Sequence, residues 1–414
     1  MLLYPRIFAP TLFASTLLLV TPIVMAATLP AIEPMPTLPA SALAPASLLN
    51  GAGYTVDKDV PVIGYMGQFT LRAPAGTFNA DGSEMLAIRV AELASIAQAS
   101  ALSQSGMFAE ALARSAQRTG QAIGQAVMNP VETVSGIPAG VGRFFQSTAR
   151  SVSRVAESAT GSGSPEQAGT ADATRNALGV NRAKRQIARR VGADPYTTNP
   201  VLAKQLDDLA WASFAGGVSL DVALAVSTAG VATAVSATST VSNLVWEKSP
   251  EDVRTINEGR LAAMGADANT IRAFVTNRWF PPTLSVPFVD NLAQLLHVKG
   301  RAALVALASP AASEGEARYM VNVADMARKL GLAEGEPVAI DLTRRIVQVQ
   351  TRGGRMVVPA PVDYIVWTEP VKQFAQRAST PRLRREILVS GAASPSAREG
   401  LTATGWTLKE HSER

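Results

Sequence analysis

The chain of 414 residues contains no cysteine, and this feature constrains its fold more than any other. No disulfide can cross-link the chain, and no thiolate can act as a nucleophile or as a metal ligand. Stability must therefore come from packing. The length is sufficient for one to three domains at roughly 100–200 residues each.

The first residues have the pattern of a secretory signal peptide. Arg6 precedes the apolar run 7–20, and Val24-Met25-Ala26 places small residues at a cleavage point. We expect residues 1–26 to be removed and the protein to be periplasmic or extracellular, free or associated with a membrane. Residues 27–50, rich in Pro and Ala, are expected to form a semi-extended tether.

Hydrophobic spacing predicts a helical body after this tether. Residues 51–156 are expected to hold a short hairpin within Val60–Phe78 and then helices, the first with Ser83 as its N-cap. Residues 157–174 have the Gly, Ser and Pro content of a flexible linker. Residues 175–332 return to helical spacing and predict a second helical domain.

After Gly335 the hydrophobic period changes from 3.6 to 2, which indicates strands. Residues 333–414 predict a small α+β domain in which a β-meander is followed by a β-α-β unit. Ser394 and Pro395 mark the start of the helix in that unit. The expected fold class is therefore α+β and mainly α, a helical body with this small C-terminal domain.

The net charge of +5 is concentrated locally. Residues 181–190, shortly after the linker, contain five basic residues, which are the candidate site for binding an anionic surface: Arg182, Lys184, Arg185, Arg189 and Arg190. A solvated helix face explains the same run. Outside the cytoplasm, the partners that this charge favours are an envelope protein, a lipid head group, lipopolysaccharide or a wall polymer, rather than nucleic acid.

Residues 222–246 carry no charged side chain and are long enough to cross a bilayer, which takes about 20 residues. Many Ser and Thr residues dilute the hydrophobicity, and a recurring valine row suits a helix buried in a soluble bundle. A buried helix and a membrane segment are both compatible with this pattern.

A second ambiguous motif interrupts the helical spacing, and we call it the breaker: Trp279-Phe280-Pro281-Pro282. It predicts either a fixed bend of the chain or an exposed corner that binds a partner.

No motif identifies a reaction, a cofactor or a metal. The sequence lacks G-x-S-x-G, S-x-x-K, H-E-x-x-H and Walker A patterns. Its two histidines are His297, expected at a helix C-terminus, and His411, near the chain end. Four acids lie near the junction between helices and strands, where caps or solubilising residues are also common: Glu314, Glu316, Glu334 and Glu336.

These observations favour a secreted envelope protein that acts as a non-catalytic binding or scaffolding module. A membrane-active protein that uses residues 222–246 is the alternative. A hydrolase of an envelope polymer is the third hypothesis, because paired carboxylates alone can cleave glycans when they lie about 5–10 Å apart.

Overall fold

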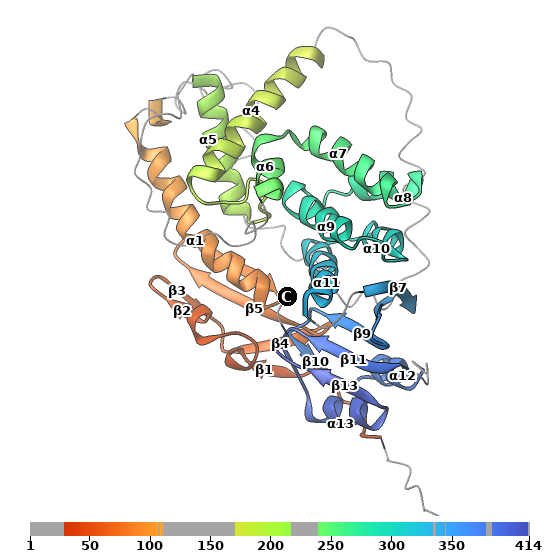
Figure 1. Cartoon of the computed structure of the whole chain (residues 1–414). Helices are drawn as coiled ribbons and strands as arrows, with labels where there is room; N and C mark the ends of the chain where they lie inside the picture. Colours follow the sequence, from red (N-terminus) through yellow and green to blue (C-terminus); the bar gives the residue numbers. More distant parts are fainter. Residues whose placement is uncertain are drawn as a thin grey trace, which may run out of the picture.

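The computed structural model of the chain describes residues 29–106, 108–110, 170–216, 239–333, 337–343, 345–377 and 383–412. The expected signal peptide, most of the expected linker and residues 222–238 of the apolar segment lie outside these ranges. Within them helices predominate, and the sheets lie near the two ends of the sequence, which confirms the α+β, mainly α class (Figure 1).

The N-terminal part folds as an antiparallel sheet, which extends the hairpin expected from the sequence. Its strands are β1 (Thr37–Pro39), β2 (Asn50–Gly51), β3 (Tyr54–Val56), β4 (Asp59–Ile63), β5 (Met66–Ala73) and β6 (Gly76–Asp81). β4 and β5 are joined by the two-residue turn Gly64-Tyr65, whose φ angles of 58° and 69° are both positive. Such a turn matches the twist of the strands that it joins.

Helices form the middle of the molecule. They are α1 (Ser83–Gln104), α4 (Thr170–Arg190), α5 (Pro200–Gly216), α6 (Ser239–Glu247), α7 (Pro250–Ala263), α8 (Ala268–Val275), α9 (Pro282–Gln294), α10 (Arg301–Ala308) and α11 (Glu314–Ala333). α7 begins with a capping box, in which the Ser249 hydroxyl accepts from the Asp252 N–H, and Pro250 follows it. Prolines also open α5 and α9, where a missing N–H costs nothing.

The C-terminal part contains the expected meander and β-α-β unit. β7 (Pro337–Thr343), β8 (Ile346–Thr351) and β9 (Arg355–Ala360) are antiparallel neighbours, and β11 (Arg384–Val389) and β13 (Trp406–Lys409) extend the sheet in parallel. α13 (Pro395–Ala403) connects β11 to β13. The remaining elements are α12 (Glu369–Arg377) and the parallel pair β10 (Tyr364–Ile365) and β12 (Ala392–Ala393).

The first helix is capped by a residue far away in the sequence. Gly82, not Ser83, occupies the N-cap position of α1 and offers no side chain. The buried Asp363 carboxylate instead accepts from the Ser83 N–H at 3.0 Å and from the Gly67 N–H at 3.0 Å. A carboxylate at this end also complements the helix dipole. The N-terminal sheet, α1 and the C-terminal part are thereby joined at one side chain.

A second connection involves the segment expected to be a tether. The Trp367 N–H and the Glu33 carboxylate are 3.1 Å apart, the Glu33 N–H donates to the Trp367 carbonyl, and the Trp367 indole donates to the Pro30 carbonyl. Trp367 is completely buried. The chain before β1 therefore lies against the C-terminal part.

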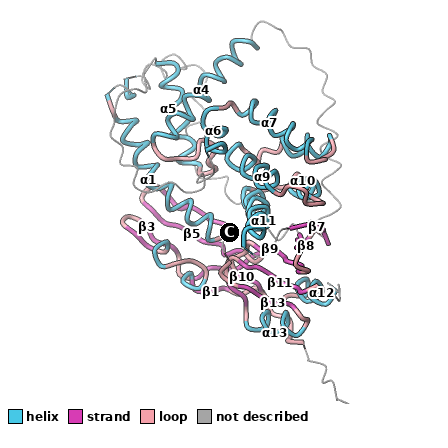
Figure 2. The backbone as a smooth tube through the Cα atoms, in the orientation of Figure 1, coloured by secondary structure: helices cyan, strands magenta, loops and turns pink. Residues whose placement is uncertain are grey.

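The described residues form three large hydrophobic cores and one small cluster, which contains Val245, Val253 and Val286. The first core contains the N-terminal sheet, α1, α4 and α5, and the second contains α7–α11 and the inner face of the meander. The third is formed by the C-terminal part together with Tyr65 and Met66. Figure 2 shows most helices at one end of the molecule and the strands at the other. α4 and α5 thus share a core with α1 rather than with α7–α11.

A substitution at Phe288 tests the packing of the core that α7–α11 form. It is fully buried against Phe274 and Phe280, with ring centroids 5.2 Å and 5.6 Å away. Phe288→Ala should lower the free energy of unfolding, measured with urea, by about 3–5 kcal/mol, because it leaves a cavity. Leu296→Ala is the control, since Leu296 is 69% exposed, and should change it by less than about 0.5 kcal/mol. Equal effects would contradict this packing.

Candidate functional site

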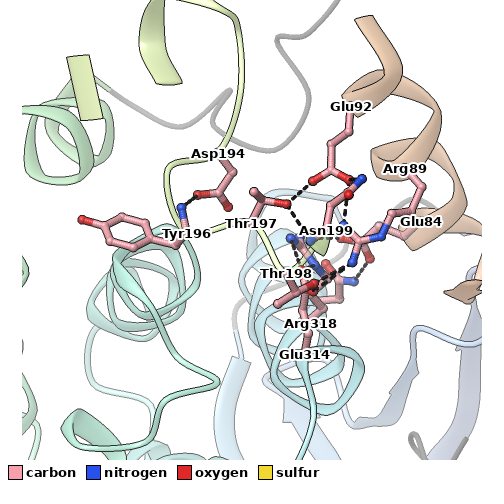
Figure 3. Close-up of polar contacts among 11 residues, drawn as sticks. Glu84, Arg89, Glu92, Asp194, Tyr196, Thr197, Thr198, Asn199, Glu314 and Arg318 are labelled. Atoms are coloured by element: carbon pink, nitrogen blue, oxygen red, sulfur yellow. Dashed lines mark hydrogen bonds and ion pairs between the residues drawn. The ribbon is translucent and has the colours of Figure 1, made fainter. Parts of the chain in front are cut away.

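Where the first and second cores meet, a buried ion-pair network joins α1 to α11 (Figure 3). Arg89 of α1 pairs with Glu92 at 2.8 Å and lies 3.5 Å from the Glu314 carboxylate on α11. Glu314 also pairs with Arg318 at 2.8 Å. The side chains of Arg89 and Arg318 are each only 9% exposed, so these charges lie largely out of water. Buried charges are tolerated when they are paired in this way.

The network holds the loop between α4 and α5. The Thr197 hydroxyl donates to Glu92, and the Thr198 hydroxyl donates to Glu314. The Asn199 amide donates to Glu92 at 3.0 Å, while its Oδ1 accepts from the Val201 N–H and so caps the start of α5. Three consecutive side chains therefore fix residues 197–199 between α1 and α11.

The charges in the network set the protonation of Glu314. Burial alone would raise the pKa of this carboxyl, but Arg318 and Arg89 more than compensate and hold the pKa below its ordinary value. Glu314 is therefore ionised at neutral pH, and its two oxygens accept from Arg318, Arg89 and Thr198. This carboxylate is already engaged by the protein.

Asp194 lies at the other end of the loop, and its surroundings shift its pKa in the opposite direction to that of Glu314. Its Oδ1 accepts from the Tyr196 N–H at 2.8 Å, which closes a local turn. Burial raises the pKa of Asp194 to about 6, against the opposing effects of the Tyr196 N–H and of Arg318. Burial also raises the pKa of Tyr196 to about 12. The loop thus presents a carboxyl that titrates near neutral pH and a phenol that stays protonated.

A cavity of about 280 Å³ opens beside this loop, and we refer to it as the polar cavity. Glu314 and Arg318 contribute to its wall from the network. The other residues that carry its chemistry are Lys184, Asp194, Tyr196, Thr197, Thr198, Arg278, Trp279 and Thr283. The wall of the polar cavity therefore combines hydrogen-bond donors and acceptors with one indole ring.

The breaker at residues 279–282 forms the opposite rim of the polar cavity. The Asn277 amide donates to the carbonyls of Ser309 and Ala311 at 2.9 Å each, and its Oδ1 accepts from the Trp279 N–H. Phe280 enters the core with its ring centroid 4.5 Å from that of Phe274. The bend is therefore fixed, as one reading of the sequence predicted, and it also brings Trp279 to the cavity.

The five candidate basic residues lie in different surroundings and do not form one exposed patch. Lys184 lines the polar cavity and pairs with Asp207 at 2.7 Å. Arg185 is buried, and Arg189 pairs with Glu247 at 2.8 Å. Arg182 is exposed and Arg190 is partly buried. Their role in binding an anionic surface stays a prediction.

Most of the polar cavity could not be recognised from the sequence. Its residues come from three separate parts of the chain, 184–198, 278–284 and 314–318. Only Lys184, Glu314 and the breaker carried a signal, and none of them indicated the others. His297 is exposed in a left-handed turn beyond the end of α9, away from this site.

The described residues contain no group of three or more His, Asp or Glu side chains placed to hold a metal ion. No protein-family model matches the chain, no curated protein matches it, and no solved structure matches it. The site must be interpreted from its own chemistry.

Asp194 makes stability depend on pH. An unfolded Asp has a pKa of about 3.9, so between about pH 4 and pH 6 the folded chain binds the extra proton, and stability falls as the pH rises. Asp194→Asn removes this titration. The stability of the variant relative to the wild type, taken as the difference between their free energies of unfolding, should therefore be higher at about pH 7 than at about pH 4, by up to about 3 kcal/mol.

Urea denaturation at several pH values measures this difference. Asp208→Asn is the control, because it removes an exposed carboxylate on α5. An Asp194→Asn effect that is the same at all pH values would contradict the raised pKa of Asp194.

Proposed function

We propose that this chain is an exported, non-catalytic binding module of the cell envelope and that it holds a polar ligand in the polar cavity. The observation that carries the proposal is the fixed wall of this cavity. Loop 197–199 is bound on both sides by the ion-pair network, and Trp279 is held by the Asn277 turn. A site formed in advance loses little entropy when its ligand binds.

The lining suits a ligand that carries many hydroxyl or amide groups. Lys184 offers donors, and the hydroxyl oxygens of Thr197 and Thr198 can accept a hydrogen bond. Asp194 accepts or donates according to its protonation, and Trp279 provides a flat apolar surface. Small-molecule sites commonly combine apolar surface with a few oriented polar groups in this way. Segments of wall polymers and the sugars of lipopolysaccharide have these properties.

Binding is favoured over catalysis because Glu314 is already occupied. A general base or nucleophile needs an accessible lone pair, but Arg89, Arg318 and Thr198 engage both oxygens of Glu314. A polymer hydrolase remains the second candidate for one reason. Asp194 and Glu314 line the same cavity with pKa values displaced in opposite directions, an arrangement that separates a catalytic acid from a base.

The membrane-active alternative has less support from the described residues. Val245, near the end of the apolar segment, is fully buried against Val253 and Val286. Among the residues that the structure describes, one helix, α1, is long and apolar enough to cross a membrane, and nearly half of its most apolar stretch is buried. A core helix meets the same criterion.

Co-sedimentation tests the proposed function. The purified protein is mixed separately with peptidoglycan sacculi, lipopolysaccharide and phosphatidylglycerol vesicles. We expect it to pellet with sacculi or lipopolysaccharide, and Trp279→Ala should weaken this binding at least about tenfold, because aromatic anchors carry much of the binding energy. Trp211→Ala, at a tryptophan that is 51% exposed on α5, is the matched control.

Three results would contradict the proposal. Pelleting only with vesicles would favour the membrane-active alternative. No pelleting with any probe would remove the binding role. Release of soluble fragments from sacculi that is lost in Asp194→Asn would establish the hydrolase instead. Thermal unfolding of each variant shows whether it is folded before its binding is compared.

A further inference from the structure

A second cavity of about 210 Å³ adjoins the polar cavity. Tyr196, Arg278 and Pro281 line both, so the two cavities meet at these three residues. The charged residues that line the second cavity are Arg254 and Arg278, with no Asp or Glu among its described lining residues. We refer to it as the arginine cavity.

Both arginines retain capacity to bind a ligand. The Arg254 Nε–H donates to the Val275 carbonyl at 3.2 Å, and its two Nη groups have no hydrogen-bond partner among the described residues. Arg278 lies 4.6 Å above the Trp279 ring and makes no ion pair with a described acid. Stacking on a ring orients a guanidinium and leaves its N–H groups free.

Asn257 is an independent sign that this cavity is built to bind something. It is only 1% exposed and lines the arginine cavity from α7, yet its Oδ1 is buried without a hydrogen-bond partner among the described residues. Leaving such an atom unpaired in the folded protein is unfavourable. Turning the amide about its last bond presents the NH₂ group in its place, so Asn257 can donate to an anion.

The start of α9 reinforces the positive charge. Pro281 and Pro282 open this helix of 13 residues at the rim of the arginine cavity, and Ser285 lines the cavity one turn later. The helix dipole places partial positive charge at that end. Glu251, in the first turn of α7, lies close enough to influence the Tyr196 phenol but does not line the cavity.

We propose that the arginine cavity is an anion subsite and that the ligand is a sugar carrying a carboxylate or phosphate group. This inference rests on the proposed function, because the uncharged part of the sugar lies in the polar cavity beside Trp279. The anionic group lies between Arg254 and Arg278 and accepts from the Asn257 amide. Arg278 faces both parts of the ligand, since it lines both cavities.

Saturation-transfer NMR titrations of the full chain with four probes test this assignment. The probes are N-acetylglucosamine, N-acetylmuramic acid, N-acetylglucosamine 1-phosphate and inorganic phosphate. At least one of the two anionic sugars should bind about tenfold more tightly than N-acetylglucosamine, because a hydrogen bond to a charged group is worth about 1.5 kcal/mol or more. Inorganic phosphate alone should bind more weakly than that sugar.

Arg254→Gln should remove most of the advantage of the anionic sugar, about fivefold to tenfold, and leave the binding of N-acetylglucosamine unchanged. Asn257→Ala should act in the same direction. Arg272→Gln is the matched control, because Arg272 is an exposed arginine on α8 that lines neither cavity.

The outcomes separate this inference from the proposed function. If all three sugars bind equally and Arg254→Gln changes nothing, the anion subsite is wrong while the binding site beside Trp279 stands. If inorganic phosphate binds as tightly as the anionic sugars, the sugar part of the assignment is wrong. If no probe binds, both proposals are contradicted.

Discussion

The ion pairs that Arg89 and Arg318 make with Glu314 are the interaction on which the rest of this structure depends. Arg89 lies on α1 and Glu314 on α11, so their pair connects the first hydrophobic core to the second, while Arg318 holds Glu314 from within α11. Removing one partner of a buried pair costs about 3–5 kcal/mol, so this pair favours one position of α1 relative to α11. The network holds loop 197–199 in place, and this loop forms part of the wall of the polar cavity.

The rest of the architecture supports the same junction. Asp363 holds the start of α1 from the C-terminal part, so the helix that carries Arg89 is fixed at its beginning as well as along its length. Asn277 and Phe280 fix the opposite rim. Between these walls, Lys184, Asp194 and Trp279 line the polar cavity, and Arg254, Arg278 and Asn257 line the arginine cavity, where they are available to a ligand. This division between a paired network and available donors is why binding, rather than chemistry on Glu314, is the function that we propose.

Local signals predicted the elements well and their assembly poorly. The helix start at Ser394-Pro395 and the alternation after Gly335 each depend on neighbouring residues, and the structure contains both features. The cap of α1 could not be predicted, because its acceptor, Asp363, is 280 residues away from Ser83. The polar cavity was hidden for the same reason: spacing along the chain does not show which loops meet. Short strands such as β1 were missed because three residues give no clear period.

The most direct test of this account is hydrogen–deuterium exchange in Arg89→Met. The Tyr196, Asn199 and Val201 amides donate within or beside the loop, so losing Arg89 should speed exchange in peptides that cover residues 194–202. Exchange in the meander β7–β9 should not change. Unaltered protection of residues 194–202 would contradict the claim that the buried network holds the wall of the site.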